Sequence, residues 1–309
     1  MPDPATHLRR PADDAARRPP FPVIVGCPRS GTSLLAVMLD AHPELAMPPE
    51  TAFVKHVVRL HGESADLAQR FVEIVTTDRA PISNWSDFGL AAADLRARVA
   101  AIEPFTVPAG MRAFFDLYAA AQGKPRAGEK TPDDTFLMRE IGAMLPEARF
   151  IHVIRDPRDT VLSWQKTWFA PSRDPAVLGA GWRHHVESGR HGGSVVAHYV
   201  ETRYEDLVRA PQRELRRLCE YLDLEYSPAM EDPSAQGAAR IARLNGRMHT
   251  SGRMISREDR TTIHRNLAQP PIAARVDVWR REMGSADRKA VERAASPLMQ
   301  QLGYAVQGE

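Results

Sequence analysis

A glycine-rich turn near the N-terminus carries side chains that suit the binding of a phosphate or sulfate group. The stretch from Val23 to Ser33 reads VIVGCPRSGTS, and its first residues belong to the apolar run Phe21 to Val25. This pattern predicts a buried strand, a tight turn and a helix over Leu34 to Ala41. Backbone N–H groups converge at the start of such a helix, where its dipole favours an anion. The residues that we expect to form this anion-binding loop are Arg29, Ser30, Gly31, Thr32 and Ser33.

The loop differs from a nucleotide-binding P-loop at one informative position. From Gly26 to Ser33 it reads G-x-x-x-x-G-T-S, whereas a P-loop reads G-x-x-x-x-G-K-[ST]. Thr32 stands where the P-loop lysine would be, and the cation comes earlier, at Arg29. The loop should therefore hold a phosphate-like group without the lysine that reaches a γ-phosphate. A P-loop kinase or ATPase stays open as an alternative, which would also need an acidic residue holding Mg²⁺ at a strand end.

A second candidate phosphate-binding pair is Arg155 and Ser163. The run RFIHVI at residues 149–154 predicts another buried strand, and Arg155 follows it directly. Ser163 lies about two helical turns further on, in a helix that Asp156 or Asp159 could cap. Both side chains could bind one further phosphate. The alternative is that Arg155 forms a salt bridge with one of these aspartates while Ser163 lies on the helix surface.

The elements that must position these residues alternate between strands and helices. We expect a third strand over Val195 to Arg203 and an amphipathic helix over residues 205–222. Strands separated by helices predict an α/β fold, with a parallel central sheet flanked by helices. Ligands of such sheets bind outside the carboxyl ends of the strands. Gly26 and Arg155 should therefore face the same crevice.

The rest of the chain is predicted to be mostly helical. Apolar spacing with a period of about 3.6 residues predicts a helical insertion at about residues 54–122. Further helices are expected over about 134–145 and about 285–302. Residues 232–271 are polar, and we expect them to be irregular.

Composition limits the classes of protein to which the chain can belong. Of its 309 residues, 43% are hydrophobic and 26% charged, as in ordinary globular domains, and a net charge of +2 gives no sign of a nucleic-acid partner. Two cysteines are too few for a disulfide framework or a four-ligand zinc site. No apolar run is long enough to span a membrane, and the N-terminus lacks the apolar region of a signal peptide. We expect a disordered tail at residues 1–20, a single domain at 21–309 and a cytoplasmic protein.

Three segments together resemble the sulfotransferase family. FPVIVGCPRSGTSLL resembles its 5′-phosphosulfate loop, and IHVIRDPRDTVLSW resembles its 3′-phosphate motif, whose Arg and Ser match Arg155 and Ser163. ETRYEDLVRAPQRELRRLCEYLDL resembles the segment that follows. The resemblance covers most of residues 21–226. It implies a P-loop-like sulfotransferase fold and 3′-phosphoadenosine-5′-phosphosulfate (PAPS) as co-substrate. Because the transferred sulfuryl group carries little charge, amide dipoles and cationic side chains could stabilise it, and we expect no metal.

The stretch PRSGTSLLAVMLDAHPELAMPPET is similar to tyrosylprotein sulfotransferases, which carry Arg in the loop. This resemblance implies that Glu50 is the catalytic base and that Lys130 contacts the sulfuryl group and the leaving oxygen. It also implies that Tyr204 lies near the adenosine. His42 is a second candidate base, because cytosolic small-molecule sulfotransferases use histidine; a helix C-terminal histidine that interacts with the dipole is the alternative.

The residues and the resemblance together predict a PAPS-dependent sulfotransferase. The enzyme would transfer a sulfuryl group by in-line displacement to a hydroxyl, or less favourably an amine, of a small-molecule, glycan or lipid acceptor. Glu50 would act as general base, and Arg29 and Lys130 would stabilise the developing charge. The insertion should shape the acceptor pocket, and residues 251–260 and 269–279 are candidates to cover the nucleotide. A non-catalytic nucleotide-binding module stays open as an alternative, and so does a homodimer.

Overall fold

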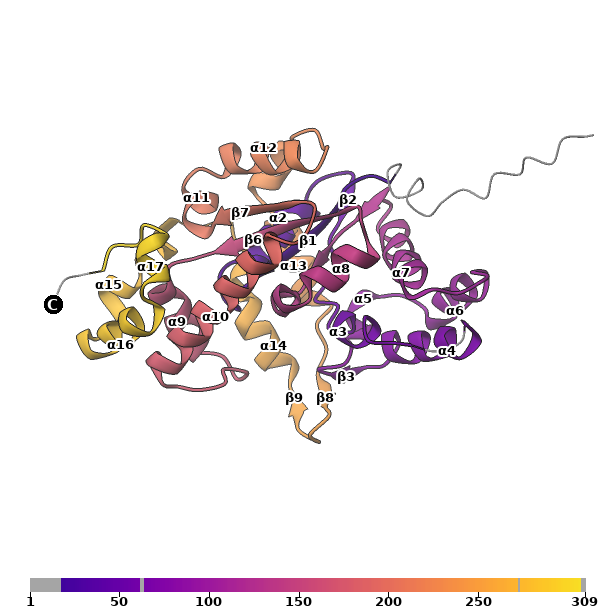
Figure 1. Cartoon of the computed structure of the whole chain (residues 1–309), viewed down its shortest axis with the longest axis horizontal. Helices are drawn as coiled ribbons and strands as arrows, with labels where there is room; N and C mark the ends of the chain where they lie inside the picture. The colour runs from indigo at the N-terminus through magenta and orange to yellow at the C-terminus, as the bar shows by residue number, and fades with distance from the viewer. Residues whose placement is uncertain (1–17, 62–63, 272, 307–309) are drawn as a thin grey trace, which may run out of the picture.

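A computed structural model of the chain describes residues 18–61, 64–271 and 273–306. The centre of the molecule is a four-stranded parallel sheet with the strand order β5-β1-β6-β7 (Figure 1). β1 pairs with β6 from Phe21 opposite Ala148 to Gly26 opposite Val153. The strands of this sheet are β1 (Phe21–Gly26), β5 (Glu129–Lys130), β6 (Ala148–Ile154) and β7 (Tyr199–Arg203).

Successive residues of β1 point to opposite faces of the sheet, and both faces are buried. Val23 and Val25 pack in one hydrophobic core with α7 (Val107–Ala121). Ile24 packs in a second core with α2 (Thr32–Asp40) and α12 (Pro211–Tyr221). A parallel strand that is covered on both faces carries apolar residues at consecutive positions, which explains the unbroken run in this strand. The predicted α/β architecture, a parallel sheet flanked by helices, is confirmed.

A third core anchors the C-terminal helices to the end of the sheet. Ile154 at the end of β6 packs with Trp182 of α10 (Pro175–Gly193) and Val291 of α16 (Ser285–Ala295). The same core includes residues of α9 (Pro157–Gln165) and α17 (Leu298–Gln301). In Figure 1 these helices lie together at one end of the molecule. The residues after β6 and the chain's last helices therefore fold against each other.

The segment between β1 and β5 is mostly helical, as expected. Its core contains the rings of Phe53, Phe88 and Phe114, whose centroids are 4.9 to 6.2 Å apart. Three short strands flank or interrupt the helices: β2 (Leu45–Ala46), β3 (Arg79–Ala80) and β4 (Arg126–Ala127). Beside α2 and α7, the helices are α3 (Val54–Val57), α4 (Ser64–Val75), α5 (Trp85–Phe88) and α6 (Ala92–Ala100).

Three segments predicted as single helices are each divided in the structure, and the one expected over about 285–302 is α16 followed by α17. The helix expected over 205–222 is α11 (Tyr204–Arg209) followed by α12, and the break falls at Ala210, just before Pro211. A residue that precedes proline is disfavoured in the α conformation, and Ala210 has φ −139° and ψ 59°. The segment expected over 134–145 is a 3₁₀ turn, η1 (Pro132–Phe136), followed by α8 (Met138–Met144).

The expectation that residues 232–271 are irregular is wrong. This segment forms α13 (Ser234–Ala242), β8 (Arg247–His249), β9 (Met254–Ile255), α14 (Arg257–His264) and the 3₁₀ turn η3 (Arg265–Ala268). β8 pairs with β3 of the insertion, and the hairpin of β8 and β9 projects beyond α14 (Figure 1). The remaining elements are η2 (Pro228–Glu231), η4 (Ala273–Arg275) and α15 (Trp279–Glu282).

The third predicted strand is also shorter than expected. The strand begins at Tyr199 rather than Val195, because α10 and its C-terminal turn extend to Ser194. Of the tail expected at residues 1–20, residues 1–17 lie outside the described residues.

Candidate active site

The carboxyl ends of the four sheet strands meet at one edge, and a predicted site residue lies at each. β5 ends at Lys130, and β1 ends at Gly26, where the anion-binding loop begins. Arg155 follows β6, and Tyr204 follows β7. All four strands run in the same direction, so their ends share one edge of the sheet. Strand order alone therefore brings together segments that are far apart in the sequence.

The anion-binding loop is held in a shape that requires glycine at Gly31. This residue is the N-cap of α2 and has φ 104°, in the left-handed region. A Cβ atom at this position would lie 2.5 Å from the ring of Tyr204. The loop also receives support from the neighbouring 3₁₀ turn, because the Gly26 N–H donates a hydrogen bond of 2.9 Å to Oγ1 of Thr135. The start of α2 therefore lies directly against the Tyr204 ring.

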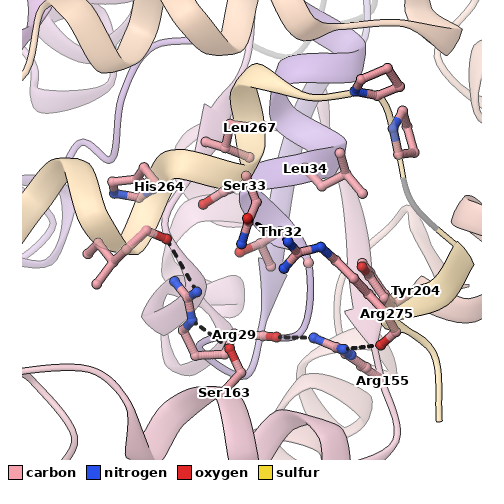
Figure 2. A pocket seen from close by; sticks show the side chains of 15 residues that line it. Arg29, Thr32, Ser33, Leu34, Arg155, Ser163, Tyr204, His264, Leu267 and Arg275 are labelled. Atoms are coloured by element: carbon pink, nitrogen blue, oxygen red, sulfur yellow. Dashed lines mark hydrogen bonds between the residues drawn. The ribbon is translucent and has the colours of Figure 1, made fainter. Parts of the chain in front are cut away.

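Arg29 connects the anion-binding loop to both α9 and the C-terminal segment. Its Nε donates to Oγ of Ser163 at 3.1 Å, and its Nη2 donates to the carbonyl of Ile263 at 3.3 Å (Figure 2). Burial lowers the pKa of Arg29 from its ordinary value, and the charge of Arg155 lowers it further. An anion placed between these two guanidinium groups would relieve their mutual repulsion.

Arg155 is fixed on the opposite side of the same site. Its guanidinium lies over the ring of Tyr204, 4.2 Å from the centroid, and donates to the carbonyl oxygens of Arg29 at 3.3 Å and Arg275 at 2.8 Å (Figure 2). Nη2 of Arg155 also lies 3.7 Å from Oδ2 of Asp159, so the salt bridge considered from the sequence is present beside these contacts. Among the residues that the structure describes, the buried Nε of Arg155 has no hydrogen-bond partner. Asp156 caps α9 by accepting from the Arg158 N–H at 2.8 Å, so one of the two expected caps is present.

Most of the residues predicted to bind a nucleotide line one cavity of about 130 Å³. Its walls also include residues from the C-terminal segment, among them His264, Leu267 and Arg275 (Figure 2). Ser30 is fully buried and is not part of this lining. The predicted residues that line the cavity are Arg29, Gly31, Thr32, Ser33, Arg155, Ser163 and Tyr204.

Glu50 and Lys130 form an ion pair beside this cavity. Nζ of Lys130 lies 2.5 Å from Oε1 of Glu50 and donates to Oγ of Ser33 at 3.2 Å. Burial favours a raised pKa for Glu50, but the charge and hydrogen bond of Lys130 outweigh it and lower the pKa from its ordinary value. Burial also lowers the pKa of Lys130, against the opposing effect of Glu50. Ser33 thus joins the ion pair to the anion-binding loop.

A second carboxylate, Glu129, lies behind this ion pair. It accepts hydrogen bonds from Oγ1 of Thr51 at 2.6 Å and Oγ1 of Thr131 at 2.7 Å. Burial raises the pKa of Glu129 to about 7, despite these two hydrogen bonds. Burial, followed by the charge of Glu129, also raises the pKa of Asp134 well above its ordinary value. Glu50 therefore has a lowered pKa and Glu129 a raised one, because of the two glutamates only Glu50 is hydrogen-bonded to Lys130.

His42 lies apart from these groups. The residue is 1% exposed, and its Nε2 donates to the carbonyl of Glu225 at 2.7 Å while its Nδ1 accepts from the Glu44 N–H at 3.1 Å. Both ring nitrogens are therefore engaged by backbone groups. The structure does not bring His42 together with the other predicted site residues.

Several residues of the site were not identified from the sequence. His264 lines the nucleotide cavity and lies near Glu50; its pKa is lowered to about 3, mainly by burial. Arg275 lines the same cavity, and Arg247 influences the pKa of Glu50. All three belong to the part of the chain after residue 232, whose local pattern carries no motif. Of the two segments expected to cover the nucleotide, 269–279 contributes Pro270, Pro271 and Arg275 to the cavity, whereas 251–260 contributes none of its lining.

Neither a metal site nor a membrane span is evident in the described parts of the chain. Within residues 18–61, 64–271 and 273–306, no three His, Cys, Asp or Glu side chains are grouped to hold a metal ion. Among the helices of these residues, none combines the length and apolar character needed to cross a bilayer.

Comparison with known sequences points to a single family. The sequence profile of the sulfotransferase family matches residues 20–228. Nodulation protein NoeE of Sinorhizobium fredii is 31% identical over 162 residues, which cover 49% of this chain and 33% of that protein. The protein-tyrosine sulfotransferase of Drosophila melanogaster is 25% identical over 228 residues, covering 69% of this chain and 40% of that protein. The chain thus spans well under two thirds of these relatives' length.

Comparison with solved structures shows the same fold. The sulfotransferase domain of the Synechococcus PCC 7002 olefin synthase has a TM-score of 0.63 and 21% identity, covering 93% of this chain and 96% of that domain. The sulfotransferase domain from the curacin biosynthetic pathway has a TM-score of 0.60 and 18% identity, covering 94% of this chain and all (100%) of that domain. The predicted sulfotransferase fold is therefore confirmed.

Proposed function

The chain belongs to the sulfotransferase family, and from that premise we propose that it transfers a sulfuryl group from PAPS to a hydroxyl group. The acceptor would be a small molecule, a glycan or a lipid. The observation that carries the proposal is the contact between the two anion-binding motifs, in which Arg29 and Ser163 meet at 3.1 Å. Both motifs line one cavity, which would give the 5′-phosphosulfate and the 3′-phosphate of one nucleotide separate contacts.

The donor would bind along the carboxyl edge of the sheet. Backbone N–H groups at the start of α2, with Arg29, would hold the 5′-phosphosulfate. Arg155 and Ser163 would hold the 3′-phosphate, and the buried Nε of Arg155 supplies a donor that lacks a protein partner among the described residues. Tyr204 would lie near the adenosine. We assign residues 21–309 to one catalytic unit, because the C-terminal segment lines the same cavity.

Glu50 and Lys130 would carry out the transfer step. Glu50 would accept the acceptor's hydroxyl proton as a bond forms between the acceptor oxygen and sulfur. At the same time the bond between sulfur and the 5′-phosphate oxygen breaks, and Lys130 and the loop N–H groups would stabilise the charge on that oxygen. Side chains and backbone dipoles supply this stabilisation, so the proposal includes no metal.

The ion pair between these residues fits the order of these events. While Lys130 contacts Glu50, the carboxylate is a weak base, because the lysine lowers its pKa. Donor binding would draw Lys130 toward the negatively charged phosphosulfate. The pKa of Glu50 would then rise, because burial favours its protonated form. The base would thus become stronger only when the donor is bound.

Calorimetric titration with adenosine 3′,5′-bisphosphate tests the donor site. We expect the wild type to bind this nucleotide far more tightly than ATP, and Arg155→Ala to weaken binding about tenfold or more, as expected for loss of a charged hydrogen-bonding contact. Arg149→Ala is the matched control, because Arg149 lies in β6, the strand that Arg155 follows, and its guanidinium lies over the ring of Tyr221. A protein that prefers ATP, or binds equally well without Arg155, would favour the kinase or ATPase alternative.

Detection of sulfuryl transfer separates an enzyme from a nucleotide-binding module. Incubation with PAPS and a panel of hydroxyl-bearing compounds should give sulfated product without added metal. Tight binding of the bisphosphate with no transfer to any acceptor would favour the module.

A further inference from the structure

A second, larger cavity opens beside Glu50 and indicates the chemistry of the acceptor. It measures about 500 Å³, within the usual range for a small-molecule site. Arg29, Thr32, Ser33 and Glu50 line it on the donor side. The other walls come from α3, β3, η1, the segment after α9, β8 and α14. A molecule in this cavity would therefore reach both the proposed base and the anion-binding loop.

Part of the lining of this cavity is apolar and aromatic. Trp168 and Phe169 pack edge to face with their ring centroids 5.3 Å apart. Phe136, whose side chain is among the exposed large hydrophobic groups, lines the same cavity. Ala52, Ala80 and Leu137 add aliphatic surface. These residues favour an acceptor with an apolar body.

Another part of the lining carries a positive charge that the protein does not neutralise fully. Arg260 binds both carboxylate oxygens of Asp87, with an Nη1–Oδ1 distance of 3.0 Å. Arg247 lies on β8, and its Nη1 approaches the same carboxylate only to 3.8 Å. Its Nε and Nη1 are buried and, in the part of the chain that the structure describes, have no hydrogen-bond partner. Two guanidinium groups thus share a single carboxylate.

The other charged groups around the cavity do not cancel this excess. Lys55 and Arg59 also line it, and Glu50 is paired with Lys130. Asp133 lies 3.4 Å from His185. Burial raises the pKa of Asp134 and favours its neutral form, whereas Arg247, whose pKa is lowered by burial to about 10, stays cationic at neutral pH.

We propose that the acceptor is an anionic compound with an apolar body, whose carboxylate or phosphate group is bound by Arg247. Its apolar body would pack against Trp168 and Phe169, and its hydroxyl would lie at Glu50. An oxyanion would supply the hydrogen-bond acceptors that Nε and Nη1 of Arg247 lack, and arginine suits planar, bidentate contacts of this kind. This inference rests on the proposed function, because it assigns the acceptor of the same site.

Binding of matched phenols measures the charge preference directly. The probes are 4-hydroxyphenylacetate, 4-hydroxybenzylphosphonate, neutral 4-ethylphenol and cationic tyramine, titrated into protein saturated with adenosine 3′,5′-bisphosphate. We expect the two anionic probes to bind at least about tenfold more tightly than 4-ethylphenol, and tyramine to bind most weakly. Comparing the affinities of 4-hydroxyphenylacetate and 4-hydroxybenzylphosphonate shows whether the site prefers a carboxylate or a phosphonate group.

Three variants identify the residue responsible. Arg247→Gln should reduce the preference for anionic probes to within about threefold, because it removes the charge and most donors. Arg247→Lys should retain part of the preference. Arg257→Gln is the matched control, because this arginine is exposed and donates to the carbonyl of Ala242 outside the cavity. Unchanged bisphosphate affinity in each variant would show that the fold and donor site are intact.

The outcomes separate this inference from the proposed function. A wild type that fails to bind the bisphosphate contradicts the proposed function. A wild type that binds it but binds 4-ethylphenol as tightly as the anionic probes overturns the inference alone. An anion preference that survives Arg247→Gln also overturns it.

Discussion

At the scale of single residues, the pairing of Glu50 with Lys130 is the feature that most affects the proposed chemistry. Both side chains were singled out from the sequence by a family resemblance, whereas their mutual contact at 2.5 Å is evident only in the structure. Glu129 is the carboxylate nearest to Lys130 in the sequence, directly before it in β5. Neighbouring residues on a strand point to opposite faces, so Glu129 and Lys130 cannot readily pair with each other. The residue types were therefore predictable, but their geometry was not.

Removal of the proposed base should abolish most turnover. Glu50→Gln keeps the size of the side chain but cannot accept the hydroxyl proton, so we expect kcat to fall by about 10²- to 10⁴-fold. Affinity for adenosine 3′,5′-bisphosphate should stay within a few-fold, since Glu50 does not line the nucleotide cavity. Product formation from PAPS and calorimetry measure the two quantities. Near-full activity in this variant would exclude Glu50 as the base.

Glu129 should make the stability of the fold depend on pH. Its pKa is raised to about 7, so the folded state binds the proton more tightly than the unfolded chain. The resulting stabilisation is complete below pH ~4.5 and is lost as the pH rises through about 7. Glu129→Gln resembles the protonated form. We therefore expect this variant to gain up to about 3 kcal/mol over the wild type at pH 8, and little at pH 5.

Urea unfolding at the two pH values measures this difference. Glu140→Gln, at an exposed position of α8, is the matched control and should show the same difference from wild type at both. A pH-independent effect of Glu129→Gln would show that the carboxyl group does not titrate in this range.

At the scale of elements, the predictions succeeded where a local pattern determines the structure. Apolar runs mark the strands β1 and β6 in the sequence. The turn after β1 is marked by its glycines, and Arg155 directly follows β6. The two-residue strand β5 was missed, because it is too short to show a period. The helix α14 was missed although Ser256 and Asp259 form a capping box at its start. Its residues are mostly polar, so the hydrophobic period that predicts helices is weak there.

The anion-binding loop should not tolerate a side chain at Gly31. In Gly31→Ala the Cβ would lie 2.5 Å from the Tyr204 ring, and the backbone would keep an unfavourable φ of 104°. We expect a loss of about 1–3 kcal/mol in stability and weaker binding of adenosine 3′,5′-bisphosphate, because Tyr204 must move away from Arg155.

A second glycine separates backbone strain from the steric clash. Gly123 has φ 68°, but a Cβ there would meet no atom within 4 Å. Gly123→Ala should therefore cost about 1 kcal/mol of stability and leave nucleotide binding unchanged. Equal effects of the two substitutions on nucleotide binding would show that contact with Tyr204 is unimportant.

At the scale of the whole molecule, the site is completed by parts of the chain that no local pattern connects. Arg158 of α9 binds Asp156 with an Nη2–Oδ2 distance of 2.7 Å, and its Nη1 donates to Glu292 of α16 at 2.8 Å. Its guanidinium also stacks 3.6 Å from the centroid of Trp279. This network fixes the C-terminal helices beside α9, at the end of the molecule where they lie in Figure 1. Such contacts depend on tertiary packing, so the sequence alone did not indicate that Ile263, His264, Asn266 and Leu267 line the nucleotide cavity.

This network should couple the stability of the C-terminal region to donor binding. Glu292 is 4% exposed, and Glu292→Gln would leave Arg158 buried with a single carboxylate partner. We expect a loss of about 1–3 kcal/mol in stability, as for other weakened buried charged contacts. The segment that carries Arg275 precedes Trp279, so its displacement should also weaken binding of adenosine 3′,5′-bisphosphate by a few-fold. Thermal unfolding and calorimetry would report the two effects.

Glu282→Gln provides the control, because Glu282 pairs with Lys166 at 3.0 Å on the surface of the same region. An exposed ion pair contributes at most about 1 kcal/mol, so this variant should change neither quantity appreciably. If Glu292→Gln lowers stability but leaves nucleotide affinity at the wild-type value, the C-terminal helices stabilise the fold without positioning the wall of the donor cavity. If both quantities fall together, the donor cavity depends on the packing of the whole molecule as well as on its two sequence motifs.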